Sequence, residues 1–213
     1  MAGVGELINL EPVRERREAR ETSRAHCYVD LACPFSYLTA ERVERAFPKV
    51  SWRLACTATV ERRDPASDPA LADIVRAAAE FRAAQLHLPL QWPDRFPAQV
   101  PAAMRAAAFA AEQGRGGVFV LAAGRLAFCG GFDLEDPEIL AEAAAAAGIG
   151  LDACLEAARD TRRDAPIEAA SRRLLAVGAD RLPVLKVGRT LLWTERRISA
   201  YLAAGRGRAA LSR

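Results

Sequence analysis

The stretch DLACPFSYLTAERVERAF, residues 30–47, indicates how the first part of the chain folds. The pair Cys33-Pro34 follows the short β-rich run HCYVDL (26–31) and opens a helical pattern. Proline suits the first helical position because its missing N–H would have no partner there. The next run, VSWRLACT (50–57), alternates apolar and polar side chains as a half-buried strand does. These three segments predict a β-α-β unit with two parallel strands.

The rest of the chain is predicted to be mainly helical until two short strands near its end. Asp-Pro pairs at 68–69 and 136–137 are N-cap and first-turn signals. GVFVLAAGRLAFCGG is interpreted as mostly helix, and the proline-rich LHLPLQWPDRFPAQVP as an irregular loop. The runs LPVLKVG and TLLWT flank a hairpin candidate at Gly188-Arg189, and a closing helix follows. The predicted order is βαβ, a long helical segment and ββα.

Composition excludes several function classes. The 213 residues suit one domain with a substantial insertion. Thirty basic and 27 acidic residues give a net charge of +3, which is too balanced to indicate a nucleic-acid partner. No run approaches the roughly 18 apolar residues of a membrane span. Residues 1–24 lack the apolar segment of a signal peptide and mix both charge signs, so we expect a charged arm on a cytoplasmic protein.

The cysteines predict free thiols. They are odd in number, their spacing forms no tight framework, and no export signal precedes them, as in proteins of a reducing cytoplasm. No CxxC or CxxH pair occurs and only two histidines are present, so we expect no metal site. The five are Cys27, Cys33, Cys56, Cys129 and Cys154.

Cys33 is the strongest candidate for a catalytic residue. A thiol at a helix N-terminus faces unpaired backbone N–H groups and the positive end of the helix dipole, which predicts a pKa below the usual value of about 8.5 and a reactive thiolate. The alternative is a buried structural cysteine. Ser36 stands where a redox motif carries its second cysteine, so no internal disulfide can form there. Ser36 is a second catalytic candidate, and its alternative role is to cap the turn.

The order of these elements resembles the thioredoxin fold interrupted by a helical insertion, as in the DsbA-like superfamily. The nearest resemblance is to the branch of 2-hydroxychromene-2-carboxylate isomerases and kappa-class glutathione transferases. The matching stretches are VDLACPFSYL (29–38), LPLQWPDRFPAQVPAAMRAA (88–107), AFCGGFDLEDPEIL (127–140) and RLPVLKVGRTLLW (181–193). The fold class implied is α/β, thioredoxin-like, with a large all-helical insertion.

The resemblance also implies domain boundaries. Residues 25–62 and 164–213 are expected to form the thioredoxin-like domain, and 63–163 the helical insertion domain. The branch often forms homodimers, so a homodimer is expected.

Further site residues follow from the resemblance. Pro183 is expected to be cis, with Leu182 before it offering its backbone N–H and C=O to a peptide or to glutathione. The residues expected to bind ligand or thiol are Pro34, Phe35, Leu182, Pro183, Trp193, Thr194 and Glu195. Trp92, Phe96 and Gln99 are expected in the substrate pocket. Core packing for Trp193, a solvated Glu195, and domain docking by Trp92 and Phe96 are the alternatives.

The chain departs from the branch at four places, the first being Gln99, which stands where the branch's usual Phe-Pro-x-Asn has its Asn. Cys33 stands where the branch usually has serine, and CTATVERRDPAS lacks the Lys and Asn that handle substrate in the isomerases. Arg196 aligns with an Asp that lies near the amino group of glutathione.

Three functions remain open from the sequence. The first is a thiol-dependent isomerase or transferase that binds glutathione or another low-molecular-weight thiol and acts on a small apolar or aromatic substrate. The second is a monothiol thiol-disulfide oxidoreductase. The third is a non-catalytic binding or scaffold protein. A Cys33 pKa below about 7 favours the enzymes, and a value above about 9 favours the third.

Overall fold

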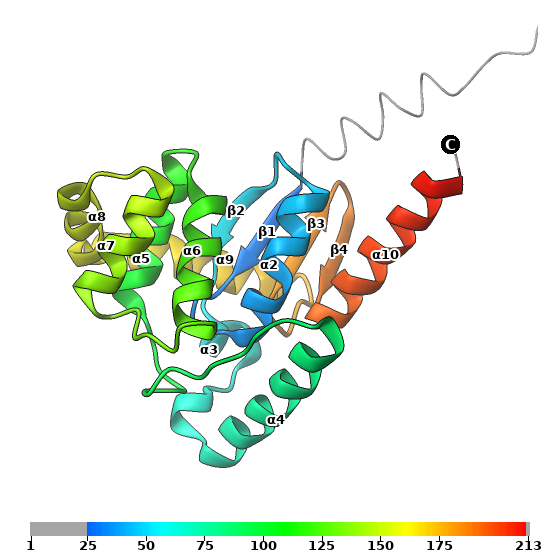
Figure 1. The fold of residues 1–213 in the computed structure, drawn as a ribbon, viewed down its shortest axis with the longest axis horizontal. Helices are drawn as coiled ribbons and strands as arrows, with labels where there is room; N and C mark the ends of the chain where they lie inside the picture. The colour runs from blue at the N-terminus through cyan, green and yellow to red at the C-terminus, as the bar shows by residue number, and fades with distance from the viewer. Residues whose placement is uncertain (1–24, 212–213) are drawn as a thin grey trace, which may run out of the picture.

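The computed structural model describes residues 25–211, and the side chains of residues 25–205 (Figure 1). A four-stranded sheet with the order β2-β1-β3-β4 lies at its centre. β1 pairs with β2 in parallel and with β3 antiparallel, and β3 and β4 form an antiparallel hairpin. The predicted β-α-β unit and the predicted hairpin are confirmed. The strands are β1 (His26–Val29), β2 (Ser51–Leu54), β3 (Val184–Val187) and β4 (Thr190–Trp193).

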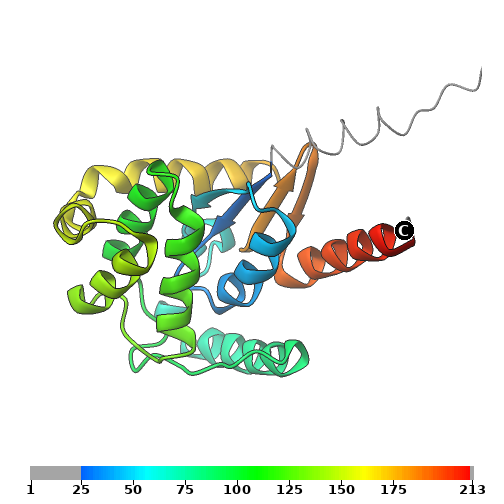
Figure 2. The ribbon, with the colours of Figure 1, turned by 45° about the horizontal axis from the view of Figure 1, so that its top comes forward.

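Helices cover both faces of the sheet (Figure 2). On one face, α2 (Pro34–Ala46) packs beside α10 (Glu195–Leu211). On the other face, α9 (Asp164–Ala176) packs against the short α3 (Thr57–Glu61). This two-sided layering around β1 is the arrangement that the α/β thioredoxin-like class requires.

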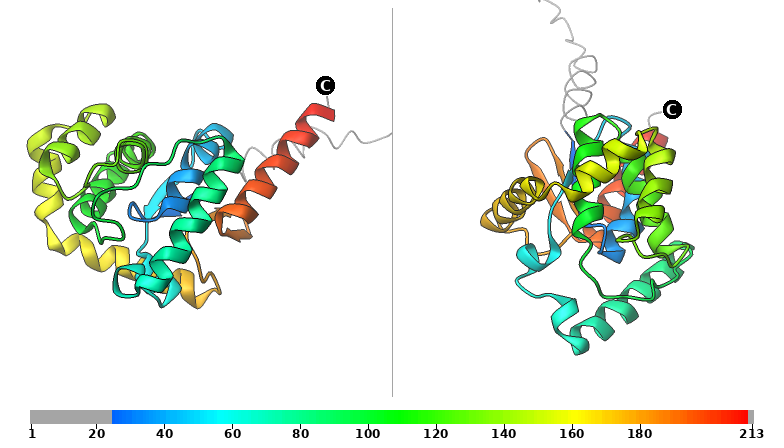
Figure 3. Two further views of the ribbon diagram at one scale, coloured as in Figure 1. Left: turned by 60° about the horizontal axis from the view of Figure 1, so that its bottom comes forward. Right: turned by 90° about the vertical axis from the view of Figure 1, so that its left-hand side faces the viewer.

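The segment between α3 and α9 is helical, as predicted. Its elements are η1 (Pro65–Ser67), α4 (Pro69–Leu86), α5 (Pro101–Glu112), α6 (Gly116–Phe128), α7 (Pro137–Ala147), α8 (Leu151–Arg159) and η2 (Thr161–Arg163). Both predicted N-caps are present, because the Asp68 carboxylate accepts from the Leu71 N–H and the Asp136 carboxylate from the Glu138 N–H. α4 lies beside α2, as the views in Figure 3 show.

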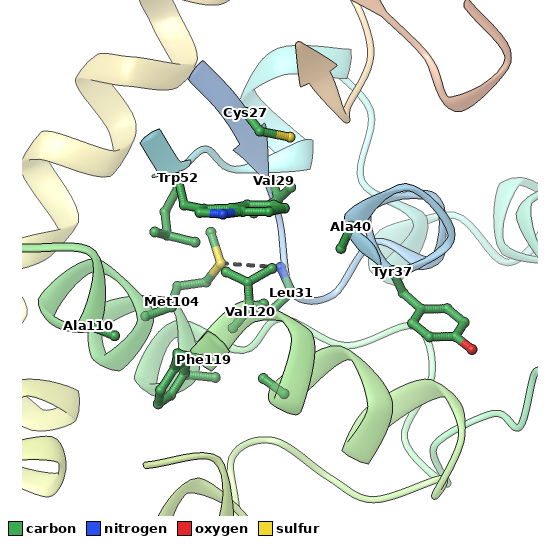
Figure 4. Packing of buried hydrophobic residues seen from close by; sticks show 14 of the residues in the cluster. Cys27, Val29, Leu31, Tyr37, Ala40, Trp52, Met104, Ala110, Phe119 and Val120 are labelled. Atoms are coloured by element: carbon green, nitrogen blue, oxygen red, sulfur yellow. Dashed lines mark hydrogen bonds between the residues drawn. The ribbon is translucent and has the colours of Figure 1, made fainter. Parts of the chain in front are cut away.

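One apolar cluster joins the sheet to these helices (Figure 4). The Trp52 ring of β2 packs near Met104 of α5, and Phe119 of α6 is fully buried in the same cluster. The Leu31 N–H points at the Met104 sulfur at 3.4 Å, which ties the end of β1 to α5. The loop between β1 and α2 is therefore held from both sides.

α3 was not predicted, because VSWRLACT reads as a strand to residue 57, whereas β2 ends at Leu54 and a helix begins at Thr57. A helix of five residues is too short to show the 3.6-residue repeat of apolar side chains. No helix within residues 25–211 is long and apolar enough to span a membrane.

Candidate functional site

A cleft of about 280 Å³ lies where the N-terminus of α2 meets α3, α9 and the loop before α5. Its wall is mostly apolar, with a smaller number of polar groups, as in binding sites for small molecules. The apolar side includes Ala32, Cys33, Pro34, Phe35, Val75, Phe96, Pro97, Val100, Pro101, Met104 and Ile167. The polar side includes Asp30, Thr57, Glu61, Asp64, Gln99, Asp164 and Glu168.

Cys33 is the N-cap residue of α2. Its backbone is extended (φ −92°, ψ 115°), its C=O accepts from the Ser36 N–H at 3.0 Å, and its N–H donates to the Asp30 C=O at 3.1 Å. Its side chain lines the cleft but is only 6% exposed. All five cysteines are free, so Cys33 is a thiol and not half of a disulfide.

The prediction that the pKa of Cys33 is lowered to give a thiolate is wrong. Burial, together with the nearby Glu61 and Asp30 carboxylates, raises the pKa of the Cys33 thiol to about 12. The Ser36 N–H lowers this pKa, as a helix N-terminus should, but burial outweighs it. Cys33 is therefore a neutral S–H group at pH 7.

Asp30 fixes the turn that carries Cys33. Its carboxylate accepts from the Ala32 N–H at 2.9 Å and from the Thr57 N–H at 2.7 Å, so it joins the start of α2 to the start of α3. Burial raises the pKa of Asp30 in spite of these two bonds. Ser36 lies behind the turn, where its Oγ accepts from the Asp30 N–H at 3.2 Å. Ser36 is buried and outside the cleft lining, so its geometry is that of the capping role.

Glu61, at the end of α3, lines the same cleft and was missed from the sequence. Its Oε1 accepts from the Leu182 N–H at 3.5 Å, and the Leu182-Pro183 peptide bond is cis as expected. The backbone N–H expected to receive a ligand is thus already held by a side chain of the protein. Burial raises the pKa of Glu61 to about 7, so this carboxyl is close to half-protonated at neutral pH.

The proline-rich loop brings two of its three predicted residues to the cleft. Phe96 and Gln99 line it, and the Gln99 side-chain amide donates to Asp64 at 3.0 Å. Trp92 does not line the cleft but packs against the Phe96 ring with centroids 4.3 Å apart. The Arg76 guanidinium lies over both rings, at 4.9 and 5.0 Å, so Trp92 supports the wall from behind.

The three predicted ligand residues at and just after the end of β4 do not line the cleft. Trp193 is partly buried. The Arg197 guanidinium lies over its indole ring, with the guanidinium carbon 4.5 Å from the ring centroid. The Thr194 N–H donates to the C=O of Pro183 at 3.1 Å. The alternative prediction, that Glu195 is solvated, is wrong. Its side chain is only 2% exposed, and its carboxylate accepts a hydrogen bond from Arg42 of α2 at 2.8 Å. Leu182 and Pro183 are themselves buried beside the cleft without lining it.

Within residues 25–205, no group of three or more His, Cys, Asp and Glu side chains is arranged to hold a metal ion. What the cleft does bring together is a buried neutral thiol, two carboxyl groups with raised pKa values and an aromatic wall. Such a set can donate a hydrogen bond from sulfur, exchange a proton at a carboxyl group and hold an apolar ligand.

Known proteins with the same fold were found both by a family model and among solved structures. The chain matches the model of the DSBA-like thioredoxin domain over residues 26–202. A 2-hydroxychromene-2-carboxylate isomerase structure shares 14% identity at a TM-score of 0.72, with 87% of this chain and 95% of that chain covered. A probable DsbA oxidoreductase from Streptomyces coelicolor shares 20% identity at a TM-score of 0.68, with 85% and 87% covered.

A putative protein disulfide isomerase from Nitrosomonas europaea shares 14% identity at a TM-score of 0.59, covering 79% of this chain and 88% of that one. No curated protein sequence matches the chain. At these identities the structural neighbours establish the fold alone. The family model spans most of the chain, so this protein belongs to the DSBA-like thioredoxin family.

Proposed function

We propose that this chain is a thiol-dependent enzyme that binds a low-molecular-weight thiol, glutathione among the candidates, in the cleft at the start of α2. It then isomerises a small apolar or aromatic substrate or transfers the thiol onto it. One observation carries the proposal: the Cys33 thiol and the Phe96 ring line the same cleft of about 280 Å³. Thiol chemistry and an apolar binding wall are therefore available to one small ligand.

Cys33 acts in this proposal as a hydrogen-bond donor rather than as a nucleophile. A thiol with a pKa of about 12 is ionised in only about one molecule in 10⁵ at pH 7, which disfavours a direct attack on a disulfide. A neutral S–H can instead donate to the thiolate of a bound thiol. The positive end of the α2 dipole stabilises the same charge. The resembled branch places a serine hydroxyl at this position, and the two groups share this donor role.

A non-catalytic binding protein is the second candidate. The Cys33 pKa favours it, since a value above about 9 is what that alternative predicts. CTATVERRDPAS also lacks the Lys-Asn pair of the isomerases. Such a protein would bind a thiol in the cleft without turning over a substrate.

Replacing Cys33 by serine and by alanine tests the donor role. Serine keeps a donor, so thiol binding should stay within about twofold of wild type. Alanine removes a hydrogen bond to a charged thiolate, which is worth about 1.5–3 kcal/mol, so binding should weaken by about tenfold or more. The measurements are the thermal shift produced by glutathione, mycothiol and bacillithiol, and the rate of thiol conjugation to a chloronitrobenzene.

The outcomes separate the candidates. Thiol binding with conjugation supports the enzyme, and binding without any conjugation supports the binding protein. Insulin-disulfide reduction that is lost equally in both variants would favour the oxidoreductase. If neither these three thiols nor a small uncharged or cationic thiol raises the melting temperature of the wild-type protein, the proposal is wrong.

A further inference from the structure

Every charged side chain that lines the cleft is acidic. The lining contains five carboxyl groups and no Lys, Arg or His. They are Asp30, Glu61, Asp64, Asp164 and Glu168. A cleft lined by one sign of charge between low-dielectric walls concentrates the field of those charges and favours ligands of the opposite sign.

Two of the five have cationic partners. Both Asp164 oxygens accept from Arg105, each at 2.7 Å. Glu168 accepts from the Thr59 hydroxyl at 2.9 Å and lies 3.9 Å from the Arg172 guanidinium. Both carboxylates also reach solvent, which weakens their effect inside the cleft.

Asp30, Glu61 and Asp64 form no ion pair within residues 25–205. Asp30 accepts two backbone N–H groups, and Asp64 accepts the Ala66 N–H and the Gln99 amide. Glu61 accepts only the Leu182 N–H, through one oxygen at 3.5 Å, and Arg181 acts on it at longer range. Among these three, Glu61 therefore has the most unused capacity to accept hydrogen bonds.

We infer that the cleft selects a thiol that carries a protonated amine and is uncharged or cationic overall, and that Glu61 is the residue that binds the amine. This inference rests on the proposed function, because it specifies which thiol that site takes. Thiols with carboxylate groups are disfavoured by the same side chains.

The two ends of such a ligand meet complementary groups. Its ammonium faces Glu61, which forms no ion pair within residues 25–205 and accepts one hydrogen bond, from the Leu182 N–H. Its sulfur lies toward Cys33 and the N-terminus of α2, where the helix dipole favours negative charge. A zwitterionic aminothiol therefore matches the cleft at both ends, whereas a thiol carboxylate places a second negative charge beside the acidic group.

Three small thiols of similar size and different charge test the inference. Cysteamine carries an ammonium, 2-mercaptoethanol a hydroxyl and thioglycolate a carboxylate. Their dissociation constants are measured on the full chain at pH 7 by titration of backbone amide resonances, under reducing conditions and at low ionic strength. We expect cysteamine to bind tightest and thioglycolate about tenfold more weakly, because one charge is reversed in a partly enclosed site.

Glu61→Gln identifies the responsible residue. Glutamine keeps an oxygen for the Leu182 N–H and removes the charge, so the ratio between cysteamine and thioglycolate should fall severalfold. Glu138→Gln removes the same charge from an exposed position on α7 and should leave the ratio unchanged. The wild-type ratio should also shrink as salt rises from about 0.02 M to about 0.5 M, because screening weakens charge selection.

Equal or tighter binding of thioglycolate would overturn the inference, as would a ratio that Glu61→Gln leaves unchanged. In either case thiol binding itself, and so the proposed function, would stand. If none of the three thiols and no glutathione shifts the resonances of cleft residues, the proposed function fails, and the inference fails with it.

Discussion

Replacing Glu195 by alanine is expected to lower the free energy of unfolding by about 3–5 kcal/mol, because it leaves buried charges without a partner. The Glu195 carboxylate accepts from Arg42 of α2 at 2.8 Å, from Arg82 of α4 at 3.0 Å, and from Ser199 of its own helix. The two arginine side chains are each only 19% exposed. Without the carboxylate, both guanidinium groups stay in a site that water reaches poorly.

Glu41→Ala is the matched control. Glu41 also bridges two arginines, Arg45 and Arg125, but these are 76% and 57% exposed. Exposed pairs contribute little, so this variant should lose no more than about 1 kcal/mol. Urea unfolding followed by circular dichroism measures both variants. A loss below about 1 kcal/mol in Glu195→Ala would show that Glu195 does not hold α2, α4 and α10 together.

The same variant separates a structural role from a ligand-binding one. The sequence resemblance predicts that Glu195 binds ligand, whereas the structure places it outside the cleft lining. We therefore expect Glu195→Ala, at a temperature where it is folded, to bind thiols as wild type does. A selective loss of thiol binding in the folded variant would support the prediction from the resemblance.

Local signals explain why much of the fold could be predicted. The Asp68 and Asp136 caps depend on side chains two or three residues from their backbone donors, so the sequence pattern contains the whole interaction. The hairpin at Gly188-Arg189 and the alternation of β2 are local in the same sense. The cis bond before Pro183 came from the resemblance and not from spacing.

Long-range contacts explain what could not be predicted. The pKa of Cys33 was predicted from its position at the start of a helix alone. In the structure, burial and the Glu61 carboxyl, which comes from another element, raise this pKa. Glu61 itself lies on a helix of five residues that leaves no periodic pattern. Glu195 meets partners 113 and 153 residues away, and nothing near it in the sequence indicates a buried ion pair.

Glu61→Gln is expected to make the protein more stable than wild type at pH 8 but not at pH 5. The pKa of Glu61 is about 7 in the folded protein and 4.5 ordinarily. Between these values the folded state holds a proton that the unfolded state has lost, so wild-type stability falls as pH rises through this range. The full difference corresponds to about 3 kcal/mol, and solvent reaching the carboxyl reduces the expected effect to about 1–3 kcal/mol.

Urea unfolding gives the free energy of unfolding of the variant and of wild type at pH 5 and at pH 8. The effect is the amount by which the gap between the two proteins changes from one pH to the other. Glu138→Gln, which removes an exposed carboxylate, should show the same difference from wild type at both pH values. Parallel behaviour of Glu61→Gln and wild type would mean that Glu61 ionises as an ordinary glutamate.

Saturating cysteamine should stabilise wild type more at pH 8 than at pH 5, because an ammonium beside Glu61 supports the ionised carboxylate. In Glu61→Gln that difference should disappear, since glutamine has no charge for the ammonium to neutralise.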